Sequence, residues 1–170
     1  MYFHSWLTPM SNAKTSERPD TPHILAPPPV IFLGAVALGV ALQTLWPLRL
    51  FAHSIAARLV GVCLMLVGLA LSGAVVHHFG RAGTPAIPWR ETRRLVVSDP
   101  YRFSRNPDYV GQALLVGGLG LLLAVPWVFV ALVPALLLVR YAVIAREERY
   151  LERRFGEEYR RFRARVRRWF

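Results

Sequence analysis

The chain has 170 residues, of which 54% are hydrophobic, and its formal net charge is +11. An ordinary soluble domain is excluded, because the apolar residues gather in long runs and most Lys and Arg residues lie beside those runs. The same distribution argues against nucleic-acid binding, because a nucleic-acid-binding protein would carry its basic residues on the surface of a soluble domain. Cys63 is the only cysteine, so neither an intramolecular disulfide nor a cysteine metal site is available.

The first 29 residues predict a disordered lead. They contain Lys14, Arg18 and three consecutive prolines, and they lack an apolar core of signal-peptide length. The sequence leaves open whether Met1 or Met10 is the start. Residues 30–170 are expected to form a single membrane domain.

Four apolar segments have the length of a membrane span, which is roughly 20 largely apolar residues with a range of about 17 to 25. None of them contains an acidic residue. The last two are separated only by Pro126, so they should form a tight helical hairpin. The sequence therefore predicts an all-α integral membrane protein with about four transmembrane helices. These spans are residues 30–46, 59–79, 109–125 and 127–144.

The orientation follows from arginines in the flanking segments, because positive charge is retained on the cytosolic side. Residues 80–108 hold six arginines and the tail from Arg146 holds ten, whereas the opposite side offers Arg49 and Arg58. We therefore expect a protein of the cytoplasmic membrane with its N-terminus, its loop 80–108 and its tail in the cytosol.

A histidine pair and a glycine cluster lie within the apolar runs, and neither predicts a functional site. His77 and His78 are adjacent on a helix and point about 100° apart, so no metal site is predicted. The glycine cluster Gly117, Gly118 and Gly120 lies in an apolar run, where small residues allow helices to pack closely.

Loop 80–108 is long for a helix connection, and its aromatic residues and prolines are unusual for a free linker. It is either a packed cap or a functional loop. Asn106 and Pro107 predict a helix start that the Asn side chain caps. A helix N-terminus attracts anions, so Arg102 and Arg105 could form a carboxylate or phosphate site, or serve only as topology determinants.

Glu147 and Glu148 follow the fourth span directly, where a helix C-terminus disfavours negative charge. Either nearby arginines or a cationic ligand must compensate them. The tail 145–170 has apolar residues at steps of three or four, which predicts an amphipathic helix on the membrane surface. A solvated basic terminus is the alternative. The apolar residues are Leu151, Phe155, Tyr159, Phe162, Val166 and Trp169.

Six short motifs follow one another from residue 83 to the C-terminus. They are Gly83-Thr84, Leu95-Val96, Tyr101-Arg102, Arg105-Asn106-Pro107-Asp108-Tyr109-Val110-Gly111, Glu147-Glu148-Arg149-Tyr150-Leu151 and Phe155-Gly156-Glu157-Glu158-Tyr159. Together they resemble the isoprenylcysteine carboxyl methyltransferase family, as a short bacterial member would. That family includes relatives that act as phospholipid methyltransferases.

The resemblance implies a methyltransferase whose S-adenosylmethionine lies in a cytosolic pocket closed by the loop and the tail. Leu95 and Val96 would lie along the adenosine, and Glu147 with Glu148 would hold the ribose or ammonium group. Tyr101 and the turn 106–109 would enclose the cofactor. The implied cofactor-binding residues are Leu95, Val96, Tyr101, Asn106, Pro107, Tyr109, Glu147 and Glu148, and the candidate catalytic residues are Arg102, Arg105 and Asn106.

The acceptor decides which groups the reaction needs. A terminal carboxylate, with a pKa of roughly 3.5, is already ionised and needs only orientation by arginine, whereas an amine of pKa about 10.4 must first lose a proton. The chain has many arginines and few bases, so it favours a lipid-linked carboxylate such as an isoprenylcysteine or an isoprenoid acid. A phospholipid amine is the alternative.

Four residues depart from the family pattern. Asn106 stands where His is common, Asp99 replaces Gly before Pro100, Asp108 replaces an apolar residue, and Val143 stands where prenylcysteine enzymes carry Arg. Arg140 lies one turn before that position.

Two further functions remain open. Membrane sterol reductases share the loop-and-hairpin pattern but use NADPH, which would need a dense pocket of arginines. A non-catalytic scaffold that binds anionic lipid through its tail is the other alternative. The expected partners are the bilayer and a lipophilic acceptor, and the oligomeric state is not indicated. The arginines for a reductase would be Arg93, Arg94, Arg102 and Arg105.

Overall fold

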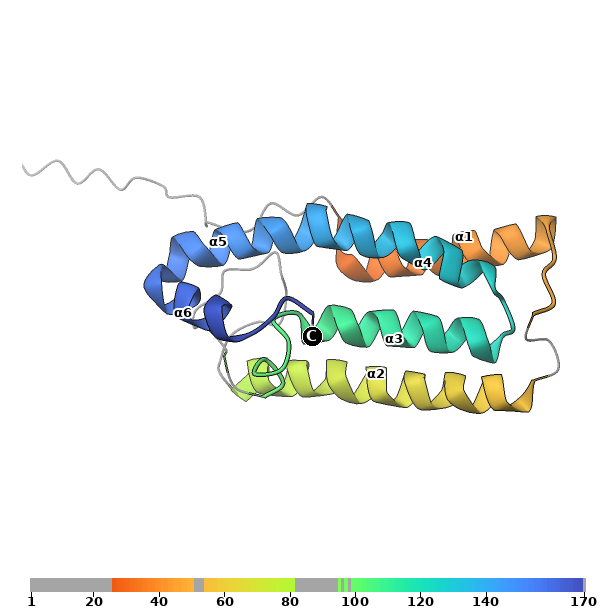
Figure 1. Ribbon diagram of the computed structural model, residues 1–170, viewed down its shortest axis with the longest axis horizontal. Coiled ribbons are helices and arrows are strands. Elements are labelled where there is room, and N and C mark those ends of the chain that lie inside the picture. Colours follow the sequence, from red (N-terminus) through yellow and green to blue (C-terminus); the bar gives the residue numbers. More distant parts are fainter. Residues whose placement is uncertain (1–25, 51–53, 82–94, 96, 98, 170) are drawn as a thin grey trace, which may run out of the picture.

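The computed structural model describes residues 26–50, 54–81, 95, 97 and 99–169, and over these residues it is all-helical, as expected. Figure 1 shows the helices side by side, most of them nearly parallel to one long axis. The predicted lead is described only from residue 26 onward. In chain order the elements are α1 (Pro28–Leu45), α2 (Ile55–Arg81), α3 (Pro107–Leu122), α4 (Trp127–Leu138), the π-helix η1 (Val139–Ile144), α5 (Ala145–Phe155) and α6 (Glu157–Arg165).

The helices pack in the order α2, α3, α4, α1, with α1 also touching α3. Within the described residues, three helices are long and apolar enough to cross a membrane: α1, α2 and the continuous helix Trp127–Phe155 formed by α4, η1 and α5. Helix α3 has only 16 residues, fewer than the roughly 20 of a typical span, so a fourth crossing stays a prediction. Large apolar side chains such as Leu33 and Leu66 are more than 60% exposed on α1 and α2, which fits contact with lipid.

The expected helical hairpin is present between α3 and α4. Residues 123–126 connect the two helices, with Ala124 at a φ of 54° and the Val125 N–H donating to the Gly120 carbonyl over 2.8 Å. The Trp127 indole N–H donates to the Trp46 carbonyl over 2.6 Å. This bond fixes the end of α1 against the start of α4.

Glycines allow α2 and α3 to approach at backbone distance. A Cβ atom at Gly68 would lie 2.6 Å from the Gly111 carbonyl oxygen, and one at Gly118 would lie 2.6 Å from the Gly61 carbonyl oxygen. The two contacts are about two helical turns apart. The expected role of Gly118 is thus confirmed, whereas a Cβ at Gly117 would meet only an ordinary contact at 3.7 Å.

Alanine substitutions on α2 test this packing. Gly68→Ala is expected to destabilise the protein by about 1–3 kcal/mol, because the added methyl group would force two backbones apart. Gly73→Ala is the matched control, since a Cβ there meets nothing within 4 Å. The control should be slightly more stable, as alanine favours a helix over glycine. Thermal unfolding in detergent compares them, and equal midpoints for the two variants would contradict the close approach.

The tail differs from the single surface helix that the sequence predicts. Helix α5 continues α4 through η1 and ends at Phe155, where Gly156 has a φ of 51° and turns the chain into α6. Tyr159 and Phe162 are 1% and 5% exposed, so these two aromatic residues pack into the protein and not into lipid. After α6, the chain returns to the start of α3 (Figure 1).

Candidate functional site

A cluster of polar side chains lies where the start of α3, helix α5 and the end of the chain meet. The structure brings most of the predicted site residues to this end of the bundle. Leu95 is half-buried, and Val96 lies outside the described residues. The residues that come together are Tyr101, Arg105, Asn106, Pro107, Tyr109, Glu147 and Glu148.

Glu147 forms the first half of this cluster with Tyr109. The Tyr109 hydroxyl donates to Oε2 of Glu147 over 3.0 Å. Tyr109 is 4% exposed, while Glu147 is half-buried. In the part of the chain that the structure describes, no Lys or Arg lies within ion-pair distance of Glu147. Among the described residues, the partner of its carboxylate is therefore a neutral group, the Tyr109 hydroxyl.

Tyr101 and Asp108 extend the acidic side of the site. Burial raises the pKa of the Tyr101 phenol well above its usual range, and the negative charges of Glu147 and Asp108 raise it further. The phenol thus stays protonated and can only act as a neutral hydrogen-bonding group. The Tyr101 ring meets Phe79 edge-to-face at 5.8 Å, and Asp108 accepts a bond of 2.8 Å from Gln112.

Glu148 forms the second half of the cluster, with arginines as partners. Arg168 binds it through two bonds, Nε to Oε1 at 3.0 Å and Nη2 to Oε2 at 2.7 Å. Nη1 of Arg105 lies 3.1 Å from Oε1. We call Arg105, Glu148 and Arg168 the arginine clamp. The hydrogen bond from Arg168 to Glu148 raises the pKa of that guanidinium, so Arg168 stays charged.

The acidic pair is thus divided between two environments. Glu148 is 8% exposed and its charge is compensated by the protein itself, whereas Glu147 has no described counter-cation. The sequence assigned the two residues one shared role. Arg168 was missed, and no local pattern marks it, because it lies 20 residues from Glu148.

Asn106 occupies the N-cap position of α3 without capping it through its side chain, so the predicted capping is wrong. Its amide Nδ2 instead donates to the Arg168 carbonyl over 2.9 Å. Ser104 Oγ donates to the same carbonyl at 3.3 Å, and the Arg105 N–H donates to the Arg167 carbonyl at 3.0 Å. The carbonyl groups of Arg167 and Arg168 thus accept three hydrogen bonds from residues 104–106.

The arginines predicted to bind an anion already have acidic partners. Arg102 pairs with Asp99 at 2.7 Å on the exposed surface and stacks over the Phe103 ring at 4.5 Å. Arg105 belongs to the arginine clamp and also donates to the Tyr159 hydroxyl at 3.5 Å. Burial, together with the charge of Glu148, raises the pKa of Tyr159 to about 12, so this phenol remains a neutral acceptor.

An apolar groove of about 420 Å³ begins beside the polar cluster, between α3 and the helix formed by α4 and η1. Val110 lines the groove and directly follows Tyr109, and Arg140, which also lines it, lies about two helical turns before Glu147 on the same continuous helix. The groove therefore begins about two turns from the Glu147 site. Leu137 lines it as well and is 50% exposed, which makes the groove continuous with the outer apolar surface. Arg140 is its charged member, and the Nε of Arg140 is buried without a hydrogen-bond partner in the described residues. The groove residues are Val110, Ala113, Leu114, Leu136, Leu137, Arg140 and Trp169.

These features define a membrane protein with a polar site and an apolar groove at the arginine-rich end of its helices. Residues 56–158 match the family model described as phospholipid methyltransferase, and the chain belongs to that family. The methyl transfer that the family's description suggests is, for this chain, a proposal. The finer resemblance to isoprenylcysteine carboxyl methyltransferases stays a prediction.

One relative of the chain is an uncharacterized protein of Haemophilus influenzae. The two are 56% identical over 34 residues, which is 20% of this chain and 54% of that protein. The chain thus spans about half the length of that relative. No solved structure matches the chain.

Proposed function

We propose that the protein transfers a methyl group from S-adenosylmethionine to the head group of a membrane lipid, at the arginine-rich end of the helices. The positive-inside rule favours the cytosol for this end. One observation carries the proposal: Glu147 presents a half-buried carboxylate without a described counter-cation, beside an apolar groove.

The residues around Glu147 fit the charged part of this cofactor. S-adenosylmethionine supplies a methyl group on a sulfonium and also carries an ammonium, so it brings two positive charges. Tyr109 engages one oxygen of Glu147, and the described residues give the other oxygen no donor. Asp108 adds a second negative charge nearby. Glu147 would hold a cationic group of the cofactor, and Tyr109 would orient the carboxylate.

The charges near the site favour an amine acceptor, which departs from the preference for a carboxylate drawn from the sequence. Arg102 and Arg105 are paired with acids, so a carboxylate acceptor would face Asp108 and Glu147 without their help. A lipid ammonium would be attracted instead. It must lose a proton before its nitrogen can accept a methyl group, and Asp108, whose charge acts on Tyr101 at the site, would be the carboxylate that receives that proton.

A lipid-linked carboxylate is the second candidate, and Arg140 is the observation that favours it. Its guanidinium lies at the groove, where it could orient an anion. The reductase alternative has less support, because Arg102 and Arg105 are paired with acids and Arg93 and Arg94 lie outside the described residues.

Transfer of labelled methyl groups tests the proposal. The protein in nanodiscs of phosphatidylethanolamine and phosphatidylglycerol is incubated with methyl-tritiated S-adenosylmethionine, and the lipid extract is counted. We expect label that survives alkaline hydrolysis and that disappears in pure phosphatidylcholine, whose nitrogen is already fully methylated. Label released by base as methanol would indicate a carboxylate ester instead. A protein that neither labels lipid nor binds S-adenosylmethionine contradicts the proposal and leaves the scaffold hypothesis.

A further inference from the structure

We infer that residues 166–169 are a built part of the acceptor site, in which Arg168 positions Trp169 as a wall of the apolar groove against the hydrocarbon chain of a membrane lipid. We call these residues the C-terminal strap. The inference rests on the proposed function for the identity of the groove's occupant. It assigns two specificity-determining positions, Arg168 and Trp169, that lie outside the motifs of the sequence.

Buried polar groups show that the C-terminal strap belongs to the folded structure. The described residues contain three buried polar or charged side chains, namely Ser104, Asn106 and Glu148. All three bind Arg168, the first two through its carbonyl and the third through its guanidinium. Buried polar groups are costly without partners. Removing the strap would therefore take a partner from all three groups at one place, and Glu148 would keep only Arg105 as a counter-charge among the described residues.

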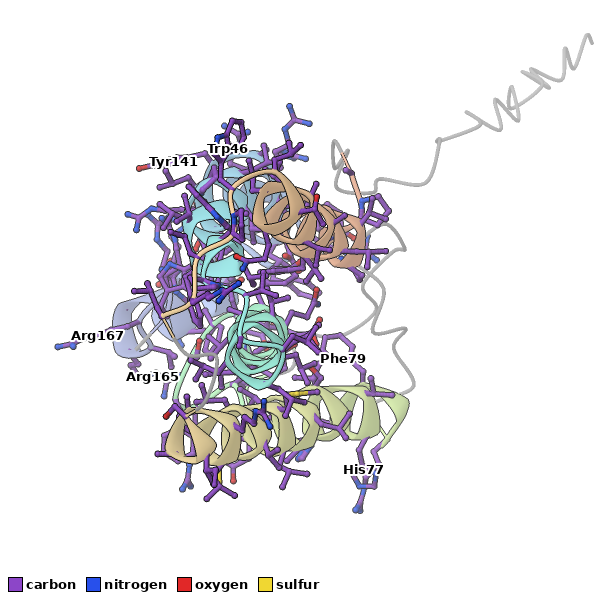
Figure 2. The ribbon with its side chains drawn as sticks, turned by 90° about the vertical axis from the view of Figure 1, so that its right-hand side faces the viewer. Trp46, His77, Phe79, Tyr141, Arg165 and Arg167 are labelled. Carbon is purple, nitrogen blue, oxygen red and sulfur yellow. The ribbon has the colours of Figure 1, made fainter. Side chains whose placement is uncertain are left out.

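The bonds of Arg168 hold the strap from two sides. Its carbonyl is fixed to the segment before α3, and its guanidinium is fixed to α5. Trp169 comes next, packs against the apolar core and lines the groove with Val110 and Leu136. The position of the indole is thus set by the polar bonds of its neighbour. Arg167, by contrast, projects away from the helices (Figure 2).

The occupant that fits this groove is the hydrocarbon chain of a bilayer lipid. The groove is apolar apart from Arg140, it starts about two helical turns from the Glu147 site, and through Leu137 it reaches the outer surface of the helices. A lipid whose head group lies at Glu147 would place its chain along the groove. Trp169 would then contact that chain and limit which chains fit.

Quenching of tryptophan fluorescence by lipid tests the contact directly. The full-length protein is placed in nanodiscs of phosphatidylcholine with brominated acyl chains, and emission is compared between the parent chain and Trp169→Phe. We expect a quenched component that is absent from Trp169→Phe. Arg168→Gln should reduce this component at least twofold, whereas Arg167→Gln, the exposed neighbour, should leave it unchanged. Equal quenching in Arg168→Gln and Arg167→Gln, or no component assigned to Trp169, overturns the inference.

A second variant keeps the test decisive if Arg168→Gln does not fold. Arg168→Lys retains the charge but replaces the two hydrogen bonds of the guanidinium with the contact of a single ammonium. We therefore expect quenching between that of the parent chain and that of Trp169→Phe. Quenching equal to that of the parent chain would overturn the inference. Binding of S-adenosylhomocysteine is measured in parallel, and Trp169→Phe should leave it unchanged. Quenching without cofactor binding contradicts the proposed function but supports the strap. Cofactor binding without quenching contradicts only the strap.

Discussion

Replacing Glu147 by glutamine is expected to weaken the binding of S-adenosylmethionine about ten- to hundredfold. A hydrogen bond to a charged group contributes about 1.5–3 kcal/mol, and every 1.4 kcal/mol or so changes affinity tenfold. Glutamine keeps the shape of the side chain and can still accept the bond from Tyr109. The loss therefore reports on the negative charge and on the exchange of one acceptor oxygen for an NH2 group, with the side-chain shape kept. Equilibrium binding of the labelled cofactor to the protein in nanodiscs measures it.

The comparison with S-adenosylhomocysteine shows which cation Glu147 contacts. This product lacks the sulfonium charge but keeps the ammonium. Equal losses for both compounds place Glu147 at the ammonium, and a larger loss for S-adenosylmethionine places it at the sulfonium. Glu152→Gln, on the same helix but paired with Arg160 and Arg163, is the control and should bind normally. Unchanged affinity in Glu147→Gln would remove the main support for the proposed site.

Replacing Glu148 by glutamine is expected to destabilise the protein by about 3–5 kcal/mol, the range found when one partner of a buried ion pair is removed. The side chains of Arg105 and Arg168 are 10% and 29% exposed, so both cations would lose their counter-charge in a largely buried place. Unfolding in mixed detergent micelles measures the effect. Glu147→Gln is the matched control, because it lacks an ion pair in the described residues.

The two neighbouring substitutions should therefore separate binding from stability. Of the two variants, Glu148→Gln should have the much lower stability. Glu147→Gln should have the much lower affinity for the cofactor, when affinity is measured on folded protein. The opposite pattern would mean that the acidic pair is assigned the wrong way round. It would then favour a cofactor site within the arginine clamp.

Several structural features could be predicted because their causes are local. The apolar runs mark the helices to within a few residues, Pro107 starts α3, and the break at Pro126 produces the hairpin. Gly118 also packs as expected, since a glycine in an apolar helix has few other uses. In contrast, the tail was predicted as one surface helix. Its regular spacing of apolar residues shows that one face is apolar, but not whether that face packs against lipid or against the rest of the protein.

The sequence by itself determined that this is an all-helical membrane protein, and its ordered motifs pointed to methyl transfer. Those conclusions depend on composition, periodicity and short motifs, which are all readable along the chain. Only the tertiary structure decided how Glu147 and Glu148 differ. Adjacent residues on a helix point about 100° apart, so one meets Tyr109 and the other meets Arg168. These partners lie 38 and 20 residues away along the chain, and chain folding alone brings them to the pair.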